Sequence, residues 1–269
     1  MSDLNTPIPL RPDWDTNAGS YKDVPYDKTH RLAHEPLVKA ETFGLASESY
    51  YARTDGENTP YDGPIEGSLP DIWCRKSVAQ KLVKANFLLA ALEIEILLLD
   101  AYRPIACQAG LWAFFMAQAQ RDMPKASDAK RREWVLTYVS DPSFFDSSNS
   151  CTWPAHSTGG AVDVTLREKT NGQVLDMGTH FDDMEPVSRT DYFESLLKKG
   201  AIQEDTHPAL RHRRWLYNAL SGVGFINYPL EVWHFDPEGT QMGICNRRAM
   251  GLNAPEKAWY GYSSPPSLG

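Results

Sequence analysis

The chain has 269 residues, of which 42% are hydrophobic and 23% charged, and its formal net charge at pH 7 is −8. This composition is that of a globular protein and excludes a fibre or a largely disordered chain. Because nucleic-acid binding relies on Lys and Arg that neutralise phosphates, the acidic charge also argues against a nucleic-acid partner. We expect the basic run at residues 211–214 to be the solvated face of a helix, since apolar residues flank it at helical spacing.

The N-terminal sequence and the hydropathy predict a cytoplasmic protein. Residues 1–7 have neither the basic start nor the hydrophobic run of a secretory signal. The most apolar stretch, residues 87–99, is shorter than the roughly 20 residues of a membrane helix and contains two glutamates. We therefore expect no membrane span and no membrane partner. Four widely spaced cysteines, without a Cys-x-x-Cys pair, should be reduced and mostly buried.

In chain order, residues 1–72 are rich in Pro, Gly, Asp and Asn, which predicts short strands and ordered loops. Apolar residues then recur at three- and four-residue steps from Arg75 to Leu92, as in an amphipathic helix. Residues 94–99 follow as a buried strand. Two further helices are expected near residues 107–121 and 129–139, before a polar loop at residues 147–150.

The second half of the chain predicts more strands. Residues 161–166 alternate, so that three apolar side chains share a buried face and Asp163 lies on the opposite, polar face. The Asn171-Gly172 turn predicts a hairpin partner near residues 174–177. The remaining expected elements are helices at residues 191–199 and 208–221 and strands at residues 225–227 and 230–235.

These elements predict a single α+β domain in which helices pack around a small, mostly antiparallel central sheet. The domain should span residues 1–269, because neither an internal repeat nor a clean linker divides the chain. Within it we expect a loop-rich N-terminal wrap (1–72), a core that carries the motifs described next (73–236) and a C-terminal extension (237–269).

The first candidate for metal binding is the segment from His156 to Asp163. A catalytic zinc site typically takes three ligands from His and Asp or Glu and leaves one position for water. The glycine pair at residues 159–160 lets the backbone turn sharply after His156, and the strand then presents Asp163 on its polar face. Taken alone, the segment is better explained by a structural histidine with a capping aspartate.

A second candidate segment contains Glu231 and His234. In a regular strand these two side chains would point to opposite faces of the sheet. They share a site if Glu231 lies at the strand entry or in a bulge, which Pro229 favours. An edge-strand acid and a packed histidine are the alternative explanation.

A third candidate is Arg103, in the turn that follows a hydrophobic strand. Pro104 biases Arg103 toward an extended backbone, from which the guanidinium can project into a cleft. The alternative is a simple ion pair with Asp100.

Together the three segments resemble the D-alanyl-D-alanine dipeptidases, zinc peptidases related to DD-carboxypeptidases and hedgehog-like domains. That family combines a His-x6-Asp segment, a Glu-x-x-His segment and an Asp-x-Tyr-Arg-Pro turn, and all three occur here in residues 100–104, 156–163 and 231–234. The resemblance implies a hedgehog/DD-peptidase-like fold and one zinc ion per chain. The residue roles that it implies are zinc ligation by His156, Asp163 and His234, acid/base catalysis by Glu231, and stabilisation of the tetrahedral intermediate by Arg103.

Two further positions bear on the substrate. Residues 176–182 resemble the family's Met-Gly-Thr-x-Phe-Asp stretch, which implies that Asp182 faces the free amino group of the substrate. A turn aspartate that accepts nearby amides is the alternative. Family members usually place a serine two residues before the first histidine, whereas this chain has Pro154, so the preference for D-Ala-D-Ala is left open.

The implied function is hydrolysis of a small dipeptide, D-Ala-D-Ala or a similar D-amino-acid dipeptide, by a metal-activated water, in cell-wall metabolism. Two alternatives are a carboxypeptidase or endopeptidase acting on peptidoglycan stem peptides and a non-catalytic zinc-containing binding domain. The second is disfavoured because zinc binding itself requires neither Glu231 nor Arg103. The sequence leaves open the native metal, the stereochemistry of the substrate and whether the chain forms a homo-oligomer.

Overall fold

A five-stranded sheet lies at the centre of the computed structural model, which describes residues 3–14, 19–183, 185–204 and 206–266. Every neighbouring pair of strands is antiparallel except the short edge pair β2 and β4. In spatial order the strands are β2 (Ala46–Ser47), β4 (Ile94–Asp100), β5 (Val162–Glu168), β7 (His234–Pro237) and β6 (Phe225–Asn227). A second, two-stranded antiparallel sheet joins β1 (Leu37–Lys39) and β3 (Trp73–Arg75). The predicted α+β fold with a mostly antiparallel sheet is confirmed.

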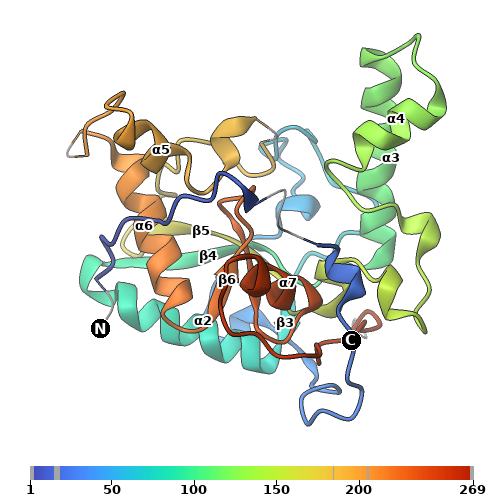
Figure 1. Ribbon diagram of the computed structural model, residues 1–269, viewed down its shortest axis with the longest axis horizontal. Coiled ribbons are helices and arrows are strands. Elements are labelled where there is room, and N and C mark those ends of the chain that lie inside the picture. The colour runs from blue at the N-terminus through green and yellow to red at the C-terminus, as the bar shows by residue number, and fades with distance from the viewer. Residues whose placement is uncertain (1–2, 15–18, 184, 205, 267–269) are drawn as a thin grey trace.

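The helices pack around this sheet, and Figure 1 shows α3 and α4 on the opposite side of the molecule from α6. The α-helices are α2 (Lys76–Leu89), α3 (Ile105–Asp122), α4 (Asp128–Val135), α5 (Tyr192–Lys198), α6 (Pro208–Ser221) and α7 (Gln241–Ala249). The short 3-10 helices are η1 (Tyr21–Asp23), η2 (Ala40–Phe43), η3 (Tyr50–Ala52), η4 (Ala90–Leu92), η5 (Pro142–Phe144), η6 (Ser150–Thr152), η7 (Ala155–Thr158) and η8 (Pro186–Ser188).

The two faces of the sheet bury two hydrophobic clusters. The first cluster joins one face of β4 and β5 to α2 and α6, whose apolar residues recur at helical spacing. The second joins Leu97 and Leu99, on the opposite face of β4, to α3 and to the tyrosines of the N-terminal segment. The alternating side chains of β4 therefore serve both clusters. The candidate site lies at the end of β4, β5 and β7 that this second cluster supports.

Several element boundaries differ from the predictions. The expected strand at residues 230–235 begins only at His234, because the amide of Glu231 bonds back to the Tyr228 carbonyl in a turn. The helix expected at residues 129–139 ends at Val135. The hairpin partner near residues 174–177 is reduced to a single bridge between Arg167 and Val174. The α7 helix was not expected.

The basic run at residues 211–214 is only in part the solvated face that we expected, with Arg211 exposed and His212 half-buried. Arg213 and Arg214 are both buried, with 1% and 2% of their surface exposed. Arg213 donates to three backbone carbonyls between residues 177 and 189, and Arg214 pairs with Glu194 and Glu204. A buried guanidinium is tolerated when its N–H groups are satisfied in this way.

The cysteine prediction agrees with the structure. Cys74, Cys107 and Cys245 are buried free thiols, and Cys151 is exposed. Burial raises the pKa of Cys74 to about 12, which keeps that thiol protonated and inert. Among the residues that the structure describes, no helix combines the length and the apolar character that a membrane crossing requires.

Candidate active site

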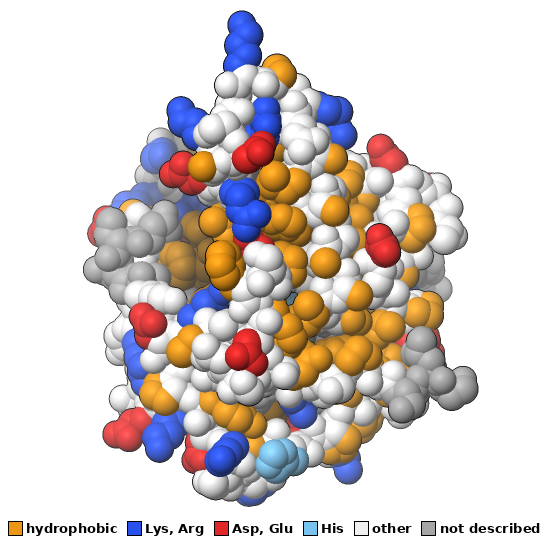
Figure 2. All heavy atoms as spheres, turned by 90° about the vertical axis from the view of Figure 1, so that its right-hand side faces the viewer, with side chains coloured by type: hydrophobic (Ala, Val, Ile, Leu, Met, Phe, Trp, Pro, Cys, Tyr) orange, Lys and Arg blue, Asp and Glu red, His pale blue; other side chains and the backbone are white. Residues whose placement is uncertain are grey.

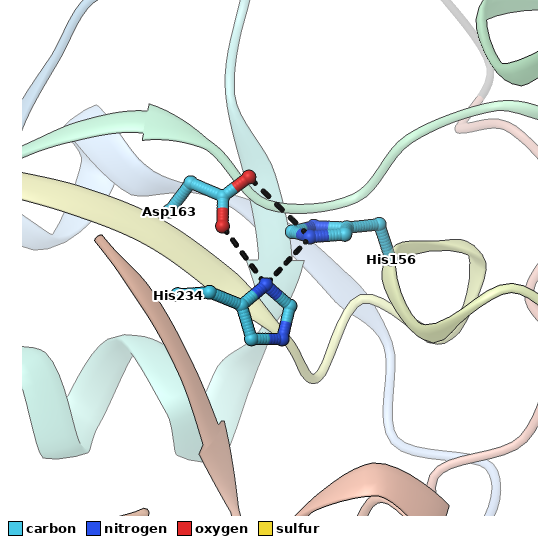
Figure 3. A group of neighbouring side chains, drawn as sticks. All are labelled: His156, Asp163 and His234. Atoms are coloured by element: carbon cyan, nitrogen blue, oxygen red, sulfur yellow. Dashed lines mark hydrogen bonds and ion pairs between the residues drawn. The ribbon is translucent and has the colours of Figure 1, made fainter. Parts of the chain in front are cut away.

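Two adjacent strands and one short helix bring His156, Asp163 and His234 together. Asp163 on β5 and His234 on β7 are directly paired in the antiparallel register, so both side chains point to the same face. His156 approaches from η7, and its candidate ligand atom and those of the other two all lie within 4.8 Å of one another. Figure 3 shows the three side chains converging.

The distances define which atom of each side chain faces the centre of this triad. His156 Nε2 lies 3.2 Å from His234 Nδ1 and 3.4 Å from a carboxylate oxygen of Asp163. His234 Nδ1 lies 3.0 Å from the other oxygen of Asp163. Two imidazole nitrogens and a carboxylate are the donor set of many catalytic zinc sites, so the residues fit a zinc ion.

The outward-facing nitrogen of each histidine is fixed by a hydrogen-bond partner. His156 Nδ1 lies 2.9 Å from the Ala101 carbonyl, and His234 Nε2 lies 2.9 Å from an oxygen of Asp236. Asp236 is fully buried, and its second oxygen accepts from the Thr240 hydroxyl at 2.7 Å. Partners of this kind hold the proton on the outer nitrogen and leave the inner one free to bind a metal.

The charges around the triad favour a cation. Burial alone would lower the pKa of His234, but Asp236 and Asp163 hold it well above its usual value. Burial also opposes ionisation of Asp163, yet His156, His234 and Arg103 keep its pKa below the ordinary value. The carboxylates therefore stabilise a positive charge here, which a divalent metal also provides.

Glu231 lies beside the triad because its backbone is in the turn that precedes β7. A carboxylate oxygen of Glu231 is 3.8 Å from His234 Nδ1. In this turn Glu231 escapes the two-residue alternation that would have placed it on the far face of the sheet. Burial raises the pKa of Glu231 to about 7, with His234 opposing the shift and Asp163 adding to it. A carboxylate with such a pKa can both accept and return a proton near neutral pH.

Arg103 is held next to Asp163 of the triad. Its backbone amide donates to the His156 carbonyl at 3.2 Å, which ties the turn after β4 to η7. Its side chain donates to Asp100 at 2.9 Å, to Gln108 at 3.3 Å and to the Tyr51 hydroxyl at 3.1 Å, and it lies 3.5 Å from Asp163. The predicted pairing with Asp100 thus exists alongside the predicted approach to the cleft. Gln108 and Tyr51 complete the fixed geometry.

Asp182 also faces this pocket. One of its carboxylate oxygens accepts from the hydroxyls of Tyr51 and Tyr61 at 2.7 and 2.8 Å. The residue has a left-handed backbone with φ of 57°, which few non-glycine residues adopt. Burial and the Asp163 charge raise its pKa to about 6, against the two tyrosine hydrogen bonds.

The loop that presents Asp182 is held by Arg213 of α6. The Arg213 side chain donates to the carbonyls of Met177, Val187 and Arg189 at 2.7 to 2.9 Å. These carbonyls lie on both sides of Asp182 in the sequence. A single buried side chain therefore connects the two ends of the loop, and the loop in turn fixes the carboxylate.

One pocket of about 250 Å³ contains all of the residues that the sequence singled out as functional. His156, Asp163, His234, Glu231, Arg103 and Asp182 all line it. Pro154 lines it as well, so the position at which the family usually has a serine contributes no hydroxyl here. Of the described residues that line the pocket, Arg103 is the only Lys or Arg.

The sequence did not reveal the supporting residues Asp236, Gln108 and Tyr61. Asp236 had a usable signal, because it follows His234 by two positions and strand side chains two apart share a face. Gln108 and Tyr61 had no comparable signal. They meet Arg103 and Asp182 only through the packing of α3 and of an irregular N-terminal loop.

Comparison with known proteins identifies similar sequences. A family model described as D-ala-D-ala dipeptidase, Peptidase_M15, matches residues 68–251. The D-alanyl-D-alanine dipeptidase of Synechocystis sp. is 31% identical over 193 residues, which cover 70% of this chain and 77% of that protein. The D-alanyl-D-alanine dipeptidase of Escherichia coli is 34% identical over 144 residues, which cover 53% of this chain and 55% of that protein.

Solved structures are more distant. The structure of VanYB in complex with D-alanine-D-alanine aligns with a TM-score of 0.41 and 16% identity, over 72% of this chain and 87% of that one. A likeness at this level supports no conclusion about the chain described here.

Proposed function

We propose that this chain, which belongs to the D-Ala-D-Ala dipeptidase family of peptidases (Peptidase_M15), is a zinc-dependent dipeptidase whose substrate is D-Ala-D-Ala or a similar dipeptide. The observation that carries the proposal is the convergence of His156, Asp163 and His234 in one pocket with Glu231 and Arg103. A metal site alone would need only the first three residues.

We assign one zinc ion per chain to His156 Nε2, His234 Nδ1 and an oxygen of Asp163. The inward-facing nitrogens, the fixed outer nitrogens and the excess of negative charge all support this assignment. When bound, the ion supplies a Lewis acid that lowers the pKa of a water molecule from about 16 toward about 7.

Glu231 is the proton carrier of the proposed reaction. Its carboxylate accepts the proton that the attacking water loses, and the same proton then passes to the amine that leaves when the peptide C–N bond breaks. The 3.8 Å distance between a Glu231 carboxylate oxygen and His234 Nδ1 supports this role. Proton transfer of this kind contributes about 10²–10⁴ to a rate.

Arg103 stabilises the negative charge that develops on the carbonyl oxygen under attack. Its guanidinium stays protonated, and its contacts with Asp100, Gln108 and Tyr51 fix its direction before the substrate binds. A donor that needs no reorganisation during the reaction is worth roughly 3–4 kcal/mol of transition-state stabilisation.

Asp182 is the proposed partner of the free ammonium of the substrate. Its carboxylate lies in the same pocket as the triad, so an ammonium bound there leaves the first peptide bond near Glu231 and Arg103. Recognition of the ammonium next to the scissile bond restricts a peptidase to the N-terminal bond of its substrate. Tyr51 and Tyr61 orient the carboxylate for this contact.

The test is hydrolysis by the purified full chain with and without zinc. The substrates are D,D-, L,D- and L,L-dipeptides and a peptidoglycan stem pentapeptide, and the readout is the release of free amino acids. We expect zinc-dependent cleavage of at least one D-containing dipeptide. Cleavage of the pentapeptide alone would indicate a stem-peptide carboxypeptidase or endopeptidase, and zinc binding without any cleavage would indicate a non-catalytic domain.

A further inference from the structure

We infer that the pocket selects a dipeptide whose N-terminal residue has a large apolar side chain, an inference that rests on the dipeptidase function proposed above. The pocket that contains the triad and Asp182 continues into a wall of apolar and aromatic side chains. We call this surface the apolar wall, and its residues are Leu111, Phe115, Leu136, Tyr138 and Val139.

Tyr61 connects the apolar wall to the proposed ammonium partner. The Tyr61 hydroxyl bonds to Asp182, and the Tyr61 ring packs edge-on against Phe115 with ring centroids 6.1 Å apart. Phe115 in turn stacks on Tyr138 at 5.3 Å. The ammonium and the side chain of an N-terminal residue branch from the same carbon atom. With the ammonium at Asp182, that side chain extends past Tyr61 toward the wall.

The wall contains no charged side chain, whereas the charged residues of the pocket surround the triad and Asp182. Leu111, Phe115 and Val139 are buried members of the second hydrophobic cluster, so core packing holds their side chains in place. An alanine methyl group would leave much of this surface uncovered. Each further methylene that fits an apolar pocket typically raises kcat/KM by about 10- to 200-fold.

The outer edge of the apolar wall presents Leu136 beside the exposed Thr137. Leu136, which follows α4, is 56% exposed although it lines the pocket. Figure 2 shows the side of the molecule that carries α3 and α4, where hydrophobic side chains gather over much of the face with single charged side chains among them. A substrate side chain that reaches past the buried residues can therefore still contact the apolar side chain of Leu136.

Residues 136–140, which carry much of the apolar wall, are held in place through a hydrogen-bonded connection to Arg103. Gln108 accepts from Arg103 and donates to the Ser140 carbonyl at 3.0 Å. The position of residues 136–140 is therefore tied to the guanidinium that faces the scissile bond. The wall belongs to the active site and is not an unrelated surface groove.

The experiment compares kcat/KM of the zinc-loaded full chain for D-Leu-D-Ala, D-Ala-D-Leu and D-Ala-D-Ala. We expect D-Leu-D-Ala to exceed D-Ala-D-Ala by at least about tenfold, and D-Ala-D-Leu to lack this gain. A chain that cleaves D-Ala-D-Ala as well as or better than D-Leu-D-Ala contradicts the inference and leaves the proposed function intact. If the chain cleaves neither these three dipeptides nor any dipeptide of the wider panel, both the inference and the proposed dipeptidase function are overturned.

A variant tests whether the wall is responsible. Leu136→Trp fills the outer part of the wall, so the ratio of kcat/KM for D-Leu-D-Ala over D-Ala-D-Ala should fall by at least about tenfold. The matched control is Leu252→Trp, at a similarly exposed leucine (46%) that does not line the pocket, and it should leave the ratio unchanged. If the kcat/KM ratio is unchanged in Leu136→Trp, the apolar wall does not contribute to substrate selection.

Discussion

The pocket has two parts that are built in different ways: the floor, which is the triad with Glu231, and the selective wall, which is the apolar wall together with Asp182. Asp163 and His234 stand on paired central strands, and each histidine is oriented by a second hydrogen bond. Asp182 and Leu136 lie in irregular segments that side chains such as Arg213 and Gln108 hold in place. Rigid strands position groups to within the tolerance that catalysis needs, while loops can vary without disturbing them.

Because the two parts are built differently, we expect substitutions in the floor and in the wall to have different effects. Changes in the floor should alter metal binding and turnover, whereas changes in the wall should alter substrate affinity and selectivity. The predictions below test that separation, beginning with the largest expected effect.

Loss of a proposed ligand should abolish metal binding. In His234→Ala the triad keeps two of its three donors, and we expect the zinc content after gel filtration to fall from about one ion per chain to near zero, together with all activity. His180→Ala, at an exposed histidine outside the pocket, is the control and should keep its metal. One tightly bound zinc in His234→Ala would refute the ligand assignment.

Replacement of the proposed proton carrier should separate turnover from metal binding. Glu231→Gln keeps the shape of the side chain but removes its basic oxygen, so kcat should fall by about 10²–10⁴ while zinc content stays at about one per chain. Glu238→Gln, at a partly exposed glutamate outside the pocket, should behave like the unmodified chain. Full turnover in metal-loaded Glu231→Gln would exclude Glu231 from the reaction.

The sequence predicted the floor far better than the wall, for a physical reason. Side-chain alternation in β5 places Asp163 opposite the valines, and the strand periodicity also showed that Glu231 needed an irregular backbone to join His234. Both inferences follow from local geometry. The observed turn at Glu231 satisfies that requirement.

The wall depends on contacts between residues that are distant in the sequence. Tyr61 reaches Asp182 across 121 positions, and Arg213 is buried because it binds the loop that begins at Met177. Local periodicity carries no information about such contacts, and for Arg213 it led to the wrong expectation of a solvated side chain. The resemblance to a known family identified Asp182 but not the residues that orient it.

Asp236 should matter to the metal although it does not face the pocket. Asp236→Ala removes the acceptor that fixes His234, so zinc affinity should fall by about 10- to 100-fold, and Asp236→Asn should recover most of it through its remaining acceptor oxygen. The readout is competition with a chelator of known affinity. Asp191→Ala, at another buried and hydrogen-bonded aspartate, controls for general destabilisation. Equal zinc affinity in the Asp236→Ala and Asp191→Ala variants would show that Asp236 has only a structural role.

Asp182 should make substrate binding depend on pH without changing the metal. Its pKa of about 6 means that lowering the pH from 7 to 5 converts most of the carboxylate to the neutral form, which no longer attracts an ammonium. The affinity for a dipeptide should therefore fall about tenfold over this range, as expected for a single group of that pKa. Calorimetric titration of the zinc-loaded Glu231→Gln chain measures this affinity while turnover is slowed by about 10²–10⁴.

The contribution of Asp182 to this pH dependence is isolated by adding Asp182→Asn to the same Glu231→Gln background. The amide cannot ionise, so binding at pH 7 should be weaker by about tenfold, and its decline toward pH 5 should disappear. Zinc content is measured at each pH, since protonation of the histidines would otherwise weaken binding in both proteins alike. If the dipeptide affinity of Asp182→Asn still declines toward pH 5 at constant zinc content, the decline must come from the floor of the pocket. The proposed division between a catalytic floor and a selective wall would then fail at Asp182.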